Sequence, residues 1–99
     1  MTTADGPAPM VVARKVVVEG RVQGVGFRDA MVDMALAANV QGYVRNTADG
    51  HVEAHVQGGE EAVARMIAWA ARGPRAARVE RVLVEAADPD PRHVSFRRA

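Results

Sequence analysis

The sequence predicts an α+β sandwich in which two helices cover one face of an antiparallel sheet, and three observations indicate it. Val-rich or alternating segments favour strands, for example at residues 11–19 and 52–57. Apolar residues recur at helical spacing after residue 26 and again after residue 60. Glycine and proline separate these segments. The chain has 99 residues, enough for one compact core.

A strand and a helix are expected first. Residues 11–19 are rich in β-branched Val and predict the first strand. Residues 20–26 include three glycines, and a helix is then expected from Phe27 to about Asn39. The apolar residues that share one face of this helix at a spacing of three or four are Phe27, Met31, Met34, Ala35 and Ala38.

A hairpin is expected next. Residues 43–46 predict a second strand, and Asp49-Gly50 supplies residues that tolerate the positive φ of a tight turn. In the third strand, Val52, Ala54 and Val56 alternate with polar residues, so one face is expected to be buried.

The second half predicts a helix and two more strands. Glu60 and Glu61 suit a helix N-terminus, and the helix is expected to stop at Gly73-Pro74. Its apolar stripe consists of Val63, Met66, Ile67 and Ala70. Residues 79–85 predict a fourth strand, and residues 94–97 a short final strand whose pairing the pattern leaves open.

The order strand, helix, strand, strand, helix, strand consists of two split βαβ units. Right-handed crossovers place the third strand between the first two, antiparallel to both, which defines a ferredoxin-like α+β sandwich. The first two strands then point the same way. We therefore expect the glycine loop after the first strand and the turn after the second to meet at one sheet edge, about 10 Å apart.

Composition excludes several functions. The net charge of +1 is too balanced for a general polyanion binder, so no nucleic-acid partner is expected. The absence of cysteine excludes disulfides and thiolate metal sites. No apolar run approaches the ~20 residues that span a bilayer, so we expect no membrane association. Residues 1–10 are expected to be a flexible tail on a cytoplasmic, monomeric domain of residues 11–99.

The glycine loop is the first candidate site. It joins a strand to a helix N-terminus, where free N–H groups and the helix dipole favour an anion. Gly24 and Gly26 let the backbone curl round a phosphate. The loop lacks the Gly-Lys-Ser/Thr of a nucleotide P-loop, and its spacing alone more often marks a tight turn.

Two blocks of sequence make the prediction specific. GRVQGVGFR, at residues 20–28, resembles the acylphosphatase signature, and GYVRNTADGHVE, at residues 42–53, resembles that family's second block. The resemblance extends over about residues 15–85. It implies hydrolysis of small-molecule acyl phosphates without a cofactor or metal, with Arg28 and Asn46 as the catalytic residues.

The resemblance also implies a phosphate cradle, formed by Gln23, Gly24, Val25, Gly26, Phe27 and Arg28. Inorganic phosphate or sulfate is expected to bind there as well. A guanidinium can pair bidentately with phosphoryl oxygens, so Arg28 supplies charge without a metal. A carboxamide accepts and donates at once, so Asn46 can orient a water but cannot deprotonate it. Taken alone, Asn46 is more often a turn residue and Arg28 a surface arginine.

Other functions remain open or are disfavoured. A non-catalytic anion-binding module on the same fold is the main alternative. The chain also resembles the acylphosphatase-like domain of carbamoyltransfer maturation enzymes. RNA-binding members of the fold expose aromatics on the sheet that this chain lacks. His51 and His55 are too far apart on a strand to share an ion, and His93 has no partner nearby in sequence, so no metal site is expected.

Overall fold

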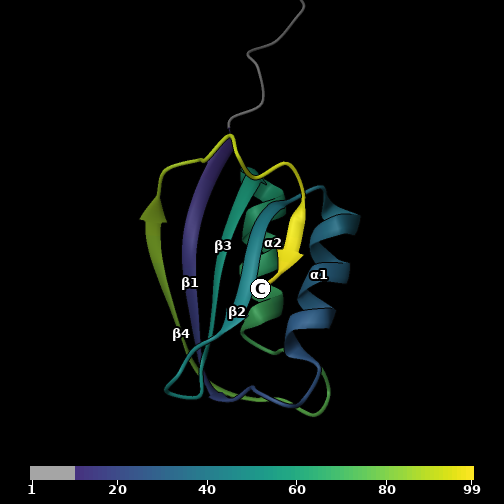
Figure 1. Cartoon of the computed structure of the whole chain (residues 1–99), viewed down its shortest axis with the longest axis vertical. Coiled ribbons are helices and arrows are strands. Elements are labelled where there is room, and N and C mark those ends of the chain that lie inside the picture. Colours follow the sequence, from purple (N-terminus) through teal and green to yellow (C-terminus); the bar gives the residue numbers. More distant parts are fainter. Residues whose placement is uncertain (1–10) are drawn as a thin grey trace, which may run out of the picture.

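The computed structural model describes residues 11–99, which form two layers, a five-stranded sheet with two helices packed on one face (Figure 1). The elements are β1 (Val11–Arg21), α1 (Phe27–Ala38), β2 (Gln41–Asn46), β3 (Val52–Gly59), α2 (Glu60–Ala70), β4 (Arg78–Ala87) and β5 (Phe96–Arg98). The predicted tail, residues 1–10, lies outside the described residues. The ferredoxin-like α+β architecture is confirmed.

The strand order in the sheet is β4-β1-β3-β2-β5. As predicted, β3 lies between β1 and β2 and is antiparallel to both. β4 pairs antiparallel with β1 on the outer side. β5 pairs parallel with β2, so the complete sheet is mixed rather than antiparallel. The ends of β1 and β2 lie at the same edge of the sheet, where the glycine loop and the β2–β3 turn meet (Figure 1).

Several element boundaries differ from the predicted ones. β5 begins at Phe96 rather than at residue 94, because Val94 is 85% exposed and the buried Phe96 is the first residue in register with β2. α2 ends at Ala70, one turn before Gly73. Met34, predicted on the buried face of α1, is 37% exposed. The helix packs through Phe27, Met31 and Ala35, and Met34 lies at the border of that stripe.

Small apolar residues fill the layer between sheet and helices. Both helices and strands β1, β2 and β3 contribute, and the largest fully buried side chains are Phe27, Met31, Met66, Val16, Val18, Val22, Val40, Val44, Val52, Val56 and Val63. The Phe27 and Trp69 rings pack against each other with centroids 5.3 Å apart and planes at 57°. Phe27 is the first residue of α1, so this contact fixes the start of the helix against α2.

A buried glutamine fixes the segment that leads into β5. Gln57 on β3 is 5% exposed, and its amide forms two hydrogen bonds to the backbone of Asp90. Its Nε2 donates to the Asp90 oxygen at 2.9 Å, and its Oε1 accepts the Asp90 N–H at 2.8 Å. The side chain thus pairs with the main chain as a neighbouring strand would, and it holds the connection between β4 and β5 against β3.

We expect Gln57→Leu to lower the free energy of unfolding by about 2 kcal/mol, because the N–H and carbonyl of Asp90 would be left without these partners. Urea denaturation followed by circular dichroism measures this. The matched control is Gln41→Leu, since the Gln41 side chain bonds only to Asn39, at 3.3 Å, among the hydrogen bonds of residues 11–99. Equal destabilisation by both substitutions would contradict the role of Gln57.

A charged cluster covers part of the sheet face opposite the helices. The Glu53 carboxylate lies 2.8 Å from Arg45 Nε and 3.3 Å from Lys15 Nζ. Burial of Glu53 acts to raise its pKa, but the hydrogen bonds from Arg45 and Lys15 outweigh burial and bring the pKa below its ordinary value of 4.5. The charged form of Glu53 therefore stabilises the fold.

This shift predicts a dependence of stability on pH. A lowered pKa contributes stability above the ordinary value of 4.5, and the contribution is lost as pH falls through the folded-state pKa. We expect Glu53→Gln to cost about 1 kcal/mol at pH 7, and its stability to approach that of the wild type in acid. Urea midpoints at neutral and acidic pH measure this. Glu61→Gln, at a side chain that is 88% exposed, is the control. A Glu53→Gln deficit that did not shrink in acid would refute the assignment.

Candidate active site

The glycine loop curls tightly into the start of α1. Gly24 and Gly26 have φ values of +73° and +79°, in the region that favours glycine. The first helical hydrogen bond runs from the Ala30 N–H to the Gly26 oxygen at 3.1 Å. The N–H groups before Ala30 have no partner within the helix, and the positive end of the helix dipole lies there. The loop and helix start therefore form a site that attracts an anion.

The side chain of Gln23 ties the glycine loop to the β2–β3 turn. Its Nε2 donates to the backbone oxygens of Thr47 and His51, both at 2.8 Å. The turn itself is closed by a hydrogen bond from the His51 N–H to Thr47 Oγ1 at 3.0 Å. Asn46 immediately precedes Thr47 at the end of β2. The prediction that the two loops meet at one sheet edge is thus confirmed.

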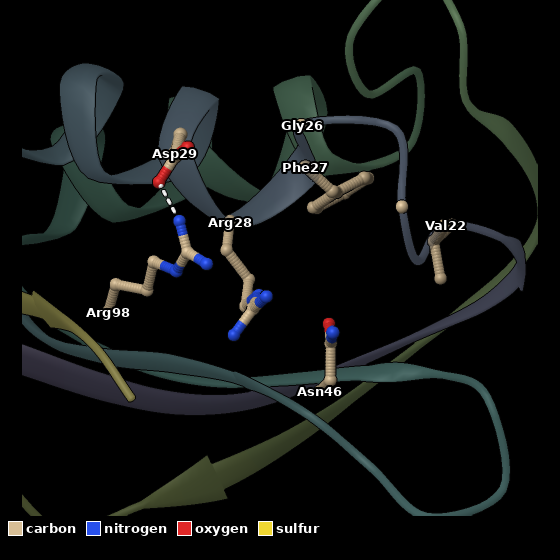
Figure 2. Close-up of a pocket in the computed structure, with 8 residues that line it drawn as sticks. Val22, Gly26, Phe27, Arg28, Asp29, Asn46 and Arg98 are labelled. Atoms are coloured by element: carbon tan, nitrogen blue, oxygen red, sulfur yellow. Dashed lines mark hydrogen bonds and ion pairs between the residues drawn. The ribbon is translucent and has the colours of Figure 1, made fainter.

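A cavity of about 180 Å³ opens where the two loops meet (Figure 2). The residues that line it are Val22, Gly24, Gly26, Phe27, Arg28, Asp29, Asn46 and Arg98. The side chains of Arg28, from the first turn of α1, and Asn46, from the end of β2, enter the same space (Figure 2). Two residues distant in sequence are therefore available to one small ligand.

The predicted cradle residues fall into two groups. Gly24, Gly26, Phe27 and Arg28 line the cavity. The remaining two residues, Gln23 and Val25, are not among its lining residues. The Gln23 side chain points to the turn, as described above, and Val25 packs against the hydrophobic core. The structure thus brings the loop glycines and Arg28 together with Asn46 and gives Gln23 a bridging position.

Ala99, the residue after β5, orients Arg28. Arg28 Nη1 donates to the backbone oxygen of Ala99 at 3.2 Å. Ala99 is held in turn by a hydrogen bond from its N–H to the Val44 oxygen on β2 at 2.8 Å. The bond from Arg28 uses one of the five N–H donors of a guanidinium. The side chain is thereby anchored at one corner and still presents a planar fork of donors.

The sequence analysis missed Arg98 and Asp29, which also line the cavity. Arg98 Nη1 lies 2.7 Å from Asp29 Oδ1, so β5 and α1 are joined by an ion pair across one wall (Figure 2). A signal was present, because Phe96 and Arg98 are two residues apart and share the helix-facing side of a strand. A strand of three residues is too short for that period to stand out.

The histidines are arranged differently from the sequence-based expectation. His55 and His93 lie with ring centroids 5.0 Å apart, and Tyr43 packs against both. His93 Nε2 is also 3.9 Å from the Asp90 carboxylate. The expectation that His93 has no partner nearby in sequence was therefore wrong, because the Asp90 carboxylate, three residues earlier, lies beside it. The crossing segment also brings His93 to His55, which is distant in sequence. Within residues 11–99, no group of three or more His, Asp or Glu side chains is placed to hold a metal ion.

Neither α1 nor α2, the helices of the described region, is long and apolar enough to cross a bilayer.

In this small α+β sandwich, the glycine loop, the start of α1 and an arginine surround one cavity. This arrangement is typical of proteins that bind a phosphoryl group. The family profile described as Acylphosphatase matches residues 14–98. The chain therefore belongs to the acylphosphatase family and hydrolyses acyl phosphates. The sequence-based prediction of family and activity is confirmed.

Individual relatives agree with this assignment. An acylphosphatase of Rhodopseudomonas palustris is 51% identical over 79 residues, 80% of each chain. The solved acylphosphatase structure of Coxiella burnetii matches with a TM-score of 0.86 at 29% identity, over 90% of this chain and 93% of that one. T. kodakarensis HypF matches with a TM-score of 0.76 at 31% identity, over 91% of this chain but 12% of HypF. The same fold thus also forms a small part of a much longer protein.

Proposed function

We propose that the cavity at the loop edge is the active site of this acylphosphatase, with Arg28 and Asn46 as its catalytic residues. The observation that supports this most directly is that both side chains line one small cavity together with Gly24 and Gly26. The phosphoryl group binds to the backbone N–H groups of the loop Gln23, Gly24, Val25, Gly26, Phe27 and Arg28 and to the Arg28 guanidinium, and the acyl group lies on the side of the phosphoryl group away from Asn46.

Arg28 supplies the charge that the transition state needs. In acyl phosphate hydrolysis, negative charge is spread over the phosphoryl oxygens while the bond to the carboxylate breaks. A guanidinium is permanently charged and pairs bidentately with two such oxygens, and the N–H groups of the loop bind the rest. Because the Arg28 side chain is already anchored through Ala99, its donors are in place before the substrate binds.

Asn46 positions the water. Its amide oxygen accepts a hydrogen bond from the water, which places the water oxygen in line with the bond that breaks. The water oxygen forms the new bond to phosphorus, the carboxylate leaves with the bonding electron pair, and the water's protons are shared between phosphate and solvent. A carboxylate is a stable leaving anion, so no strong base is needed.

The proposal also covers the cofactor, the other ligands of the cavity, the oligomeric state and the location of the protein. Arg28 and the helix start provide the positive charge that a metal ion would otherwise supply, so the enzyme acts without metal or cofactor. Inorganic phosphate and sulfate bind the same cavity, because they share the tetrahedral oxygens of the phosphoryl group. The protein acts as a monomer in the cytoplasm. These last two points are expectations from the sequence and are separate from the arrangement of the cavity.

The test is hydrolysis of benzoyl phosphate by the purified protein in the presence of EDTA. The loss of the acyl phosphate is followed by ultraviolet absorbance, and the Arg65→Ala variant, altered on the exposed surface of α2, is the control for handling. Rapid turnover by both proteins in EDTA is expected. Turnover that EDTA abolishes would overturn the metal-free mechanism. A folded protein that bound phosphate without any turnover would instead be an anion-binding module.

A further inference from the structure

A second guanidinium lines the cavity, and the mechanism above does not use it. Arg98 reaches the cavity from β5 and is paired with Asp29 of α1 at 2.7 Å. Figure 2 shows the Arg98 guanidinium beside that of Arg28, on the side of the cavity away from Val22 and the glycine loop. The side chains of Arg98 and Asp29 are 48% and 68% exposed. Both groups are therefore accessible to a ligand that enters the cavity.

The ion pair between Arg98 and Asp29 is weak enough to be exchanged. Exposed ion pairs contribute about 0–1 kcal/mol, because water screens them and both side chains lose freedom. A ligand carboxylate or phosphate can pair with a guanidinium bidentately, through two parallel hydrogen bonds. Only one Arg98–Asp29 hydrogen bond is present, from Arg98 Nη1. An anionic ligand can therefore replace Asp29 as the partner of Arg98, or share the Arg98 guanidinium with it, at little cost.

The geometry of an in-line reaction places the acyl group at the Arg98 end of the cavity. In an in-line displacement, the leaving group departs on the side of phosphorus opposite the attacking water. If Asn46 holds the water, the acyl group lies on the far side of the phosphoryl group. In Figure 2 the Arg28 guanidinium lies between Asn46 on one side and the Arg98–Asp29 pair on the other. The acyl chain thus extends toward Arg98.

We propose that Arg98 is a specificity-determining residue that selects acyl phosphates whose acyl group carries a second negative charge, as in the monophosphate of a short dicarboxylic acid. This inference rests on the proposed function of the cavity. Of the two guanidiniums that line the cavity, Arg28 pairs with the phosphoryl group, which leaves the Arg98 guanidinium as the cation that can pair with the acyl group. Arg98 makes no contribution to the phosphoryl transfer itself.

The test compares two substrates of equal length, glutaryl phosphate, whose acyl chain ends in a carboxylate, and valeryl phosphate, whose chain ends in a methyl group. We expect the wild type to prefer glutaryl phosphate in kcat/KM by about tenfold, the effect of one charge-assisted hydrogen-bonded contact at a partly exposed site. Arg98→Gln should abolish that preference, mainly through KM, and leave valeryl phosphate within about twofold of the wild type.

Two matched variants test whether the preference depends on the Arg98 side chain itself and not on the net charge of β5 or on the ion pair with Asp29. Arg97→Gln removes the same charge from the neighbouring position of β5, whose side chain points to the opposite face, so it should keep the preference. Asp29→Asn breaks the same ion pair but leaves Arg98 in place, so it should keep or increase the preference. Thermal unfolding by circular dichroism confirms that each variant is folded.

The possible results distinguish this inference from the proposed function. Hydrolysis of both substrates with equal kcat/KM by the wild type would leave the acylphosphatase site standing and overturn the role of Arg98. The role of Arg98 would also be overturned if Arg98→Gln lowered kcat/KM equally for both substrates, or if Arg97→Gln abolished the preference as Arg98→Gln does. Failure of the wild type to hydrolyse either substrate would refute the proposed function, and with it this inference.

Discussion

Arg28→Ala is expected to lower kcat/KM for benzoyl phosphate by about a thousandfold, the scale seen when a charge-stabilising group is removed from phosphoryl or acyl transfer. The substitution removes the guanidinium that faces the cavity and leaves the glycine loop unchanged. Inorganic phosphate should also bind far more weakly, because ground state and transition state share this contact. Steady-state kinetics and isothermal titration calorimetry with phosphate measure both effects.

Arg28→Lys is the informative control for that prediction. A lysine keeps the charge but replaces the planar fork of donors by a point charge on a flexible stem. Lysine also cannot reproduce the directed bond to the Ala99 oxygen while it contacts the phosphoryl group. We therefore expect little recovery of activity. If Arg28→Lys restored near wild-type turnover, charge alone would be sufficient and the bidentate geometry assigned to Arg28 would be wrong.

Asn46→Ala is expected to reduce kcat by about a hundredfold or more while phosphate still binds within a few-fold of the wild type. The reason is that the amide orients the water and contributes little to holding the phosphoryl group. Asn46 ends β2 and only part of its surface is buried, so truncation should not unfold the protein. Calorimetry with phosphate and single-turnover kinetics separate the two effects.

Asn46→Asp is the matched control, because it keeps the shape of the side chain and changes its charge. A carboxylate in the same place accepts from the water but repels the phosphoryl oxygens, so both phosphate affinity and kcat should fall. Near-normal turnover in Asn46→Ala would refute the water-positioning role. A parallel loss of phosphate affinity in that variant would instead show that Asn46 binds the phosphoryl group in the ground state.

The fold could be predicted because its elements have clear periods. Val52, Ala54 and Val56 alternate with polar residues, and the structure buries these three against the helices. Val63, Met66 and Ala70 recur at helical spacing and are buried on α2. Once the order of helices and strands is known, the handedness of the crossovers allows few arrangements, and the position of β3 between β1 and β2 follows.

The C-terminal part could not be predicted in the same way. β5 has three residues, and its parallel pairing with β2 depends on where residues 88–95 cross the end of the sheet. That crossing is held by Gln57, whose two bonds to Asp90 are long-range and leave no local pattern in the sequence. For the same reason, Arg98 at the cavity and the packing of His93 on His55 were found only in the structure.

The hydrogen bonds of Gln23 order the two loops of the cavity before a substrate binds. Gln23 joins the glycine loop to the turn that follows Asn46, so the two halves of the cavity become ordered together as the chain folds. The conformational entropy of bringing them together is then lost during folding and not during each encounter with a substrate. Without this tether, Arg28 and Asn46 would keep their places on α1 and β2, but the distance between them would fluctuate, and the effective concentration of water at the phosphoryl group would fall.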